Sequence, residues 1–303
     1  MSTLSALGNL AELELRHTPQ RVVSLVPSVT ESLFELNCGE RVRAITDYCI
    51  YPADKVRDLP KVGGTKNPDL GKVKAILPDL IIANREENRK EDVEALQAEG
   101  FKVWVTNPNT VAETFELLWA IIRLFDVPHM STVIDMMERV YEYAAQAAIE
   151  ADSQPKVFVP IWREPKNTEA PHWWMTANQH TYLHDILRVC GGANVFADRE
   201  RRYPLAADLG QAPAEPPGER DTRYPRISTA EILAHAPEII LLPTEPYPFT
   251  EADVATFNAL PELPAVQHGR VHVVDGTLLT WPGTRVGRAL AELPGYLNIF
   301  TEA

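Results

Sequence analysis

The hydrophobic and polar positions of the first half of the chain alternate between two patterns. Four short apolar runs have the length of buried strands: residues 21–26, 42–46, 79–83 and 101–106. Helical segments are expected between them, and Ser28 with Glu31 and Thr110 with Glu113 have the spacing of capping boxes that open helices. Strands that alternate with helices in this way predict a parallel sheet covered by helices on both faces.

The second half repeats this alternation. Strands are expected at residues 156–162, 238–242 and 270–275, and a helix at 182–190. Ser228 to Glu231 and Thr250 to Asp253 again have capping-box spacing. Segments 75–84 and 234–243 share a helix end, a proline, an acid and an apolar strand. We therefore predict two lobes of similar α/β build, with chance similarity between two βα units as the alternative.

One long amphipathic segment separates the two halves. Its apolar positions, from Met130 to Ala148, recur at i, i+3, i+4 and i+7, which predicts one helix of about 20 residues and ~30 Å. A rigid helix of this length predicts only small hinge motion between the lobes. The expected parts of the chain are an N-terminal extension (1–19), a first lobe (20–127), a linking helix (128–152) and a second lobe (153–303) with a proline-rich insertion (199–226).

Composition narrows the class of protein. The net charge of −13 argues against nucleic-acid and anionic-membrane partners, and no apolar run approaches the ~20 residues of a membrane helix. Cys38, Cys49 and Cys190 are far apart, so neither a disulfide framework nor a cysteine zinc site is expected. The first residues lack the pattern of a secretory signal, which predicts a cytoplasmic protein as written; a periplasmic location would require that a signal had been removed.

Candidate chemistry lies after the strands, because open α/β sheets bind ligands at the carboxyl ends of their strands. Aromatic, amide and guanidinium groups follow the predicted strands of both halves, a mixture that suits a flat ligand of mixed polarity. Several of these groups have a structural alternative: Ser28 as a helix cap, Gly63 and Gly64 as a turn, and Trp173-Trp174 as core rather than a lid. In segment 241–249 three prolines stiffen the loop that carries Glu245 and Tyr247.

Catalytic signatures are absent from the sequence, which contains no GxSxG, HExxH, strand-linked GxGxxG or GxxxxGK[ST] motif. The best metal candidates are His180 and His184, four residues apart near a helix start, with His172 nearby. No carboxylate completes the set, so a free-metal site is a third choice.

Five segments carry a resemblance to a known family: RVVSLVPSVTESLFEL, TDYCIYP, LPKVGGTKNPDLGKVKAILPDLIIA, VCGGANVF and LLPTEPYPF. Together they resemble the cobalamin-binding branch of the ABC-transporter substrate-binding proteins, in the helical-backbone metal receptor superfamily. The resemblance covers roughly residues 20 to 300. It implies two Rossmann-like lobes joined by one long helix, as in class III periplasmic binding proteins, with a corrinoid or metal chelate held between them and passed to a membrane permease without catalysis.

The same resemblance implies site residues. The expected ligand-binding residues of the first lobe are Pro27, Ser28, Tyr48, Gly64, Thr65, Lys66, Asn67, Asn84 and Arg85. Those of the second lobe are Trp162, Arg163, Trp174, Glu245, Tyr247 and Trp281. Acidic residues dock family members onto their transporters. Lys90 stands about where the first-lobe acid is expected, so Glu87 and Glu91 are candidates, with Glu251 in the second lobe.

The leading hypothesis is therefore a monomer that binds cobalamin or a related chelate, has no resident cofactor, and serves an ABC uptake system or acts as a cytoplasmic relative of one. The first alternative is a cytoplasmic enzyme that acts on such a ligand, with Glu245 as its acid or base. The second is a siderophore, haem or free-metal binder.

Overall fold

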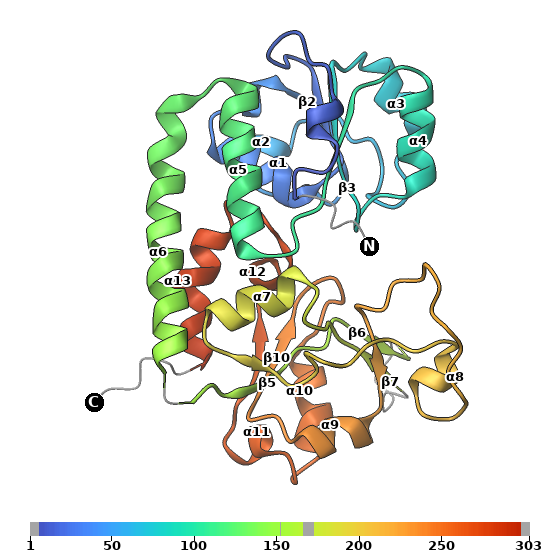
Figure 1. Cartoon of the computed structure of the whole chain (residues 1–303), viewed down its shortest axis with the longest axis vertical. Helices are drawn as coiled ribbons and strands as arrows, with labels where there is room; N and C mark the ends of the chain where they lie inside the picture. The colour runs from blue at the N-terminus through green and yellow to red at the C-terminus, as the bar shows by residue number, and fades with distance from the viewer. Residues whose placement is uncertain (1–5, 152, 166–172, 298–303) are drawn as a thin grey trace. The chain divides into compact units, whose positions relative to one another are not determined.

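The computed structural model describes residues 6–151, 153–165 and 173–297 (Figure 1). The chain forms two compact units. Unit 1 comprises Met1–Arg139 and Trp281–Gly287, and unit 2 comprises Val140–Thr280 and Arg288–Ala303. Helix α6 (Ser131–Glu150) carries the chain from the first unit into the second, which confirms the predicted long helix.

Unit 1 is built on a four-stranded sheet in the order β2-β1-β3-β4. Its strands are β1 (Val22–Ser24), β2 (Val42–Ile45), β3 (Leu80–Asn84) and β4 (Val103–Thr106), and all neighbouring pairs are parallel, as predicted. All five residues of β3 are buried. A central parallel strand is covered on both faces, which explains its continuous apolar sequence.

The helices of unit 1 are α1 (Pro27–Glu35), α2 (Ala53–Val56), α3 (Leu70–Ala75), α4 (Lys90–Ala98) and α5 (Val111–Phe125). Thr110 caps α5 as predicted, since its side chain accepts from the backbone N–H of Glu113. The capping box predicted at Ser28 and Glu31 is wrong: α1 begins at Pro27 after Val26, without a side-chain cap. The Glu31 carboxylate is bonded to Arg285 instead.

The N-terminal extension covers the edge of β4. The Asn9 side chain donates to the carbonyl of Val103 (2.9 Å) and accepts from the N–H of Val105 (2.8 Å), so it replaces a strand partner. Gly8, at φ +52°, makes this approach possible: a Cβ there would lie 1.7 Å from the Val105 carbonyl oxygen. The short 3₁₀ turn η1 (Leu10–Glu12) follows. A paired edge strand is protected against pairing with other chains.

Unit 2 contains a second parallel sheet in the order β11-β10-β5-β8. Its strands are β5 (Lys156–Phe158), β8 (Ala193–Asn194), β10 (Ile239–Pro243) and β11 (Val271–Val274). In place of the single strand expected at 156–162, the chain forms two separate strands: β5 ends at Phe158, and β6 starts at Trp162. A small antiparallel sheet, which the sequence pattern did not predict, joins β6 (Trp162–Glu164), β7 (Trp173–Met175) and β9 (Arg226–Ile227).

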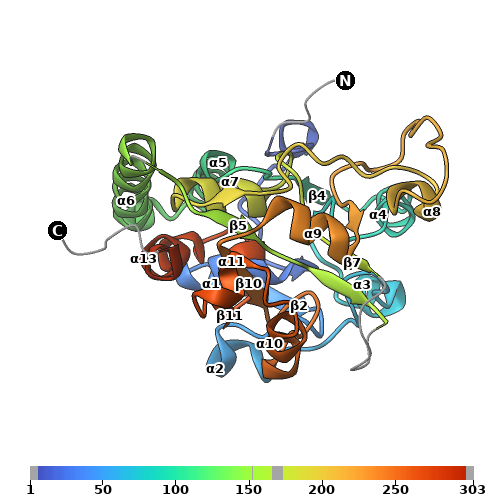
Figure 2. The ribbon, with the colours of Figure 1, turned by 90° about the horizontal axis from the view of Figure 1, so that it is seen from below.

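The helices of unit 2 lie around these strands, and α9, α10 and α11 can be followed in Figure 2. They are α7 (Tyr182–Val189), α8 (Leu205–Asp208), α9 (Thr229–His235), α10 (Glu251–Asn258), α11 (Pro264–Gln267) and α12 (Thr277–Thr280). Helix α13 (Val286–Leu297) starts in unit 1 and ends in unit 2. The capping boxes predicted at Ser228 and Thr250 are both present.

The proline-rich insertion is organised by one buried acid. Asp208, 1% exposed, accepts from the guanidinium of Arg199 (3.0 Å) and from the backbone N–H groups of Arg202 and Arg226. These bonds join the two ends of the segment, so its long loop is closed at the base.

Candidate ligand-binding site

Three of the predicted first-lobe loops are held together at the carboxyl edge of the unit 1 sheet. The glycine loop after Lys61 runs beside the end of β2, where the N–H of Asp47 donates to the Gly63 carbonyl (2.9 Å). Asn88, 6% exposed, donates to the carbonyls of Leu25 (3.3 Å) and Thr65 (2.9 Å). Its side-chain oxygen accepts from the N–H of Asn84. Asn88 therefore joins the ends of β1 and β3 to the glycine loop.

Sequence reasoning missed Asn88. It lies four residues after a strand end, where an asparagine could have been recognised as a residue that bonds back to the backbone. Lys66, a predicted ligand residue, donates to the carbonyl of Glu86 and so joins the glycine loop to the β3 loop a second time. These contacts order the loops on which ligand residues were predicted.

Tyr48 is the most exposed aromatic group of this edge. Its side chain is 63% exposed, and Ile50 beside it is 51% exposed, whereas Cys49 between them is fully buried. The Tyr48 ring lies against Gly64, since a Cβ on that glycine would be 3.4 Å from Cε2 of the ring. The same Cβ would be 2.4 Å from Oδ1 of Asn67, so a side chain at position 64 would displace the Asn67 amide.

Asn84 and Arg85 differ in what they offer to a ligand. The Asn84 side-chain amide is buried and already hydrogen-bonded within the protein: it donates to the Thr106 hydroxyl (3.2 Å) and accepts from the N–H of Glu86 (2.8 Å). It shapes the loop after β3. The Arg85 side chain is exposed, and its guanidinium has no acidic partner within the part of the chain that the structure describes. Among the described residues of this edge, Arg85 is thus an exposed cation without an acidic partner.

The start of α1 is covered by a segment from the far end of the chain. The Ser32 hydroxyl donates to the Ser28 carbonyl (2.8 Å) and accepts from the N–H of Thr284 (3.0 Å). Gly283 packs so closely that a Cβ would lie 2.9 Å from the Ser28 carbonyl oxygen. The Ser28 hydroxyl is buried and, among the described residues, has no hydrogen-bond partner.

Trp281 lies in unit 1, not with the second-lobe residues with which the sequence grouped it. Its ring meets Tyr51 edge-on, with centroids 5.9 Å apart, and only 5% of the residue is exposed. The strand β11 that precedes it belongs to unit 2, and the chain returns to unit 1 after Thr280. Only the folded path of the chain reveals this assignment.

In unit 2, Glu245 is half-buried at the carboxyl end of β10. Its carboxylate accepts from the hydroxyl of Thr280 on α12. Its backbone rests on Gly276, where a Cβ would lie 2.6 Å from the Glu245 nitrogen. The proline-stiffened loop is therefore fixed to the segment after β11, and Glu245 already has a hydroxyl partner.

Tyr247 and Trp162 form an aromatic pair beside this loop, with ring centroids 5.7 Å apart and a T-shaped arrangement. Tyr247 is 8% exposed and joins the core of unit 2, whereas Trp162 is half-buried. Burial, with a further contribution from Asp253, raises the pKa of the Tyr247 phenol. Trp162 is thus the more accessible member of the pair.

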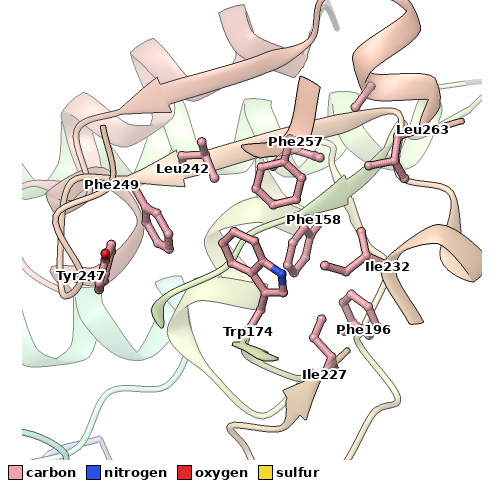
Figure 3. Close-up of a cluster of buried hydrophobic side chains, with 12 residues drawn as sticks. Phe158, Trp174, Phe196, Ile227, Ile232, Leu242, Tyr247, Phe249, Phe257 and Leu263 are labelled. Atoms are coloured by element: carbon pink, nitrogen blue, oxygen red, sulfur yellow. The ribbon is translucent and has the colours of Figure 1, made fainter. Parts of the chain in front are cut away.

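Arg163 and Trp174 lie in the core of unit 2, although both were expected to face a ligand. Arg163 is 2% exposed, and its guanidinium donates to the Asp253 carboxylate (2.6 Å). Trp174 is 1% exposed and packs on Phe257 and Phe249, with centroids 4.7 and 6.1 Å away (Figure 3). A strand alternates its side chains between two faces. In β6 this alternation buries Arg163 next to the half-buried Trp162.

The histidine hypothesis finds no support among the described residues, which contain no group of three His, Cys, Asp or Glu side chains able to hold a metal ion. His180 precedes α7, which begins at Tyr182, so the two histidines do not share a helical face. His184 lies 3.5 Å from the Asn194 amide, and burial lowers its pKa. His172 falls outside the described residues.

A cavity of about 360 Å³ lies in the insertion, lined by residues 198–202 and by Ala214, Glu215 and Pro217. None of the predicted ligand residues lines it. Of the predicted docking acids, Glu91 and Glu251 are exposed in the first turns of α4 and α10, and Glu87 is half-buried. Among the described helices, none combines the length and apolar character needed to cross a membrane.

Comparison with known proteins agrees with this fold. The chain is 28% identical over 205 residues to the vitamin B12-binding protein of Vibrio vulnificus (strain CMCP6), covering 67% of this chain and 72% of that protein. The crystal structure of the periplasmic vitamin B12-binding protein BtuF of Vibrio cholerae matches with a TM-score of 0.72 at 22% identity, covering 93% and 98% of the two chains. The periplasmic heme-binding protein RhuT from Roseiflexus sp. RS-1 matches with the same TM-score at 19% identity, covering 92% and 97%.

The model of the periplasmic binding protein family matches residues 22–278. This range includes the parallel sheets of both units and the helix that connects them. Members of the family are substrate-binding proteins that work with ABC transporters, and they bind their ligands without transforming them. On this match over most of its length, the chain belongs to the periplasmic binding protein family.

Proposed function

We propose that this protein binds a corrinoid of the cobalamin type as the substrate-binding component of an ABC uptake system. The observation that carries the proposal is the exposed Tyr48 ring on Gly64, at the carboxyl edge of the unit 1 sheet. The similarity to the vitamin B12-binding protein of Vibrio vulnificus supports the choice of ligand.

The chemistry of this edge suits a corrinoid. The corrin ring is flat and apolar on its faces, and it carries amide side chains and a phosphodiester tail. Tyr48 and Ile50 provide exposed apolar surface for such a face. Arg85 provides a guanidinium, which binds phosphate and amide oxygens.

Calorimetric titration with cyanocobalamin, cobinamide, haemin and a ferric siderophore tests the proposal. Burial of the Tyr48 ring by the ligand is worth about 1.5–3 kcal/mol. We therefore expect Tyr48→Ala to weaken cyanocobalamin binding by about one to two powers of ten. Tyr143→Ala is the matched control, because Tyr143 is similarly exposed (68%) but lies on α6.

Wild-type protein that binds neither cyanocobalamin nor cobinamide would sink the corrinoid proposal. Equal affinities for the Tyr48→Ala and Tyr143→Ala variants would remove Tyr48 from the site. Turnover is tested in the same samples: we expect the bound corrinoid to be recovered unchanged after long incubation. A converted product whose formation stops in Glu245→Gln would favour the enzyme instead.

Haem is the second candidate, and the same residue favours it. An exposed tyrosine phenol can serve as an axial ligand to haem iron, and Tyr48 is the exposed phenol of this edge. If haemin binds more tightly than cyanocobalamin, and Tyr48→Phe changes the visible absorption spectrum of the complex, the ligand is haem. An unchanged spectrum would argue that the Tyr48 phenol does not bind iron.

A partner permease follows from the proposed role. Glu91 and Glu251 are exposed at the starts of helices on different units, and we propose them as the docking acids. Glu87 is the weaker choice, because it is half-buried and has an interaction partner of its own.

A further inference from the structure

Arg285 is buried in unit 1 although it comes from the C-terminal end of the sequence. Its guanidinium donates through Nε (2.9 Å) and Nη2 to the two carboxylate oxygens of Glu31 on α1, 254 residues earlier. The two residues are 3% and 4% exposed. A bidentate pair of this kind fixes the plane of the guanidinium as well as its position.

The fixed guanidinium lies against two aromatic rings. Its carbon is 4.4 Å from the centre of the Tyr51 ring and 5.6 Å from that of Trp281. The rings of Tyr51 and Trp281 also contact each other edge-on. Arg285 therefore attaches Tyr51, near the end of the loop after β2, to the body of unit 1.

The other attachment of this loop is Cys49. The buried Cys49 thiol lies 3.1 Å from the hydroxyls of Thr30 and Thr46. The Lys61 ammonium donates to the backbone carbonyl of Cys49 (3.2 Å). Tyr48 and Ile50 extend outward on either side of Cys49, with about half or more of each exposed. The segment that carries Tyr48 and Ile50 is thus held in place by Cys49, which lies between them, and by Tyr51, which follows them.

We propose that Arg285 is a positioning residue for ligand binding. Held by Glu31, it fixes Tyr51 and Trp281 and thereby sets the conformation of the loop that presents Tyr48 and Ile50. This inference rests on the proposed function, since it assigns Arg285 a role in the same binding surface. It also means that the ligand-binding edge of unit 1 depends on a segment supplied by the last quarter of the chain.

A double-mutant cycle separates positioning from general stabilisation. Arg285→Lys keeps the charge but loses the planar, bidentate contact. We expect it to weaken cyanocobalamin binding about tenfold in the wild-type background and by less than about twofold in the Tyr48→Ala background, because residues that act through one another are not additive. Arg288→Lys is the control: Arg288 also lies near the start of α13, but its pair with Glu292 is exposed. We expect it to leave the affinity unchanged.

Amide hydrogen exchange gives a readout without ligand. Exchange across residues 46–52 is expected to accelerate in Arg285→Lys and to stay at the wild-type rate in Arg288→Lys. If wild-type protein binds no corrinoid or haem, the proposed function fails, while the exchange experiment still decides the role of Arg285. Should Arg285→Lys not fold, Trp281→Phe carries the same two tests, since it leaves the Glu31–Arg285 pair in place.

Two results would overturn the inference. One is an unchanged exchange rate at 46–52 in Arg285→Lys. The other is a loss of affinity that is equally large with and without Tyr48, which would show that Arg285 does not act through Tyr48.

Discussion

Arg163 allows a decisive comparison between a structural and a ligand-binding role. The sequence places it after a strand of the second lobe, among aromatic and polar groups, where it is expected to contact the ligand. In the fold its guanidinium is buried and lies 2.6 Å from the Asp253 carboxylate. The side chains of the pair are 2% and 8% exposed, and the guanidinium carbon lies 5.4 Å from the Trp174 ring. Arg163→Met keeps much of the volume and removes the charge.

The expected cost follows from leaving Asp253 buried without its cation. Removing one partner of a buried ion pair destabilises a protein by about 3–5 kcal/mol. One carboxylate oxygen of Asp253 still accepts from the Thr250 N–H, so the lower part of this range is expected. At about 1.4 kcal/mol for each factor of ten, the folding equilibrium of unit 2 would fall by roughly a hundredfold.

Urea unfolding followed by tryptophan fluorescence measures this loss, and circular dichroism checks whether the two units unfold in one transition. Arg188→Met is the matched control. Arg188 pairs with Asp185 at 2.7 Å, but its own side chain is 45% exposed, compared with 2% for Arg163, so a smaller loss is expected. The structural assignment is refuted if Arg163→Met costs no more than Arg188→Met. A variant of normal stability that binds cyanocobalamin poorly would restore the ligand-binding role.

Two further predictions concern unit 2. Gly276→Ala is expected to destabilise the protein by about 1–3 kcal/mol, since the added Cβ would lie 2.6–2.7 Å from Glu245 atoms. Gly295 lies in helix α13, and no heavy atom lies within 4 Å of a Cβ added there. Gly295→Ala should therefore stabilise the protein by about 0.5–1 kcal/mol. Equal melting temperatures for the two variants would contradict this reasoning. Burial lowers the pKa of His184, so the unfolded chain binds a proton at higher pH than the folded one. The stability contribution of neutral His184 is therefore complete above about pH 6.5 and declines as the pH falls below it. Urea unfolding at pH 7.5 and pH 5 should show a smaller pH dependence in His184→Asn than in wild type, and identical dependence would count against the assignment.

Much of the architecture is encoded locally. Apolar runs of strand length mark β1, β3 and β10, and the spacing from Met130 to Ala148 marks α6, because period and length distinguish a buried strand from an amphipathic helix. The caps at Thr110, Ser228 and Thr250 are equally readable, since each involves residues three apart. The edge at which Tyr48 and Gly64 meet also follows from the sequence, because parallel strands present their carboxyl ends on one side.

Contacts between residues far apart in the sequence cannot be predicted from local sequence patterns. Ser28 and Glu31 have the spacing of a cap, yet Glu31 binds Arg285, 254 residues away. The pattern around β6 could not show that Arg163 turns toward Asp253, or that Trp174 fills the core of unit 2. Whether a polar side chain faces a ligand or a buried partner depends on which distant residue supplies the opposite charge.

The sequence by itself thus determined most strands of the two parallel sheets, most helices and the surface where a ligand is expected. Only the tertiary structure decided which side chains of that surface are exposed or unpaired and which are buried. It leaves Tyr48 exposed and Arg85 unpaired among the described residues, commits Asn84, Arg163 and Trp174 to the interior, and brings Trp281 back to unit 1. The physical reason is that periodicity records the burial of a face, whereas a hydrogen bond or ion pair depends on where the remainder of the chain passes.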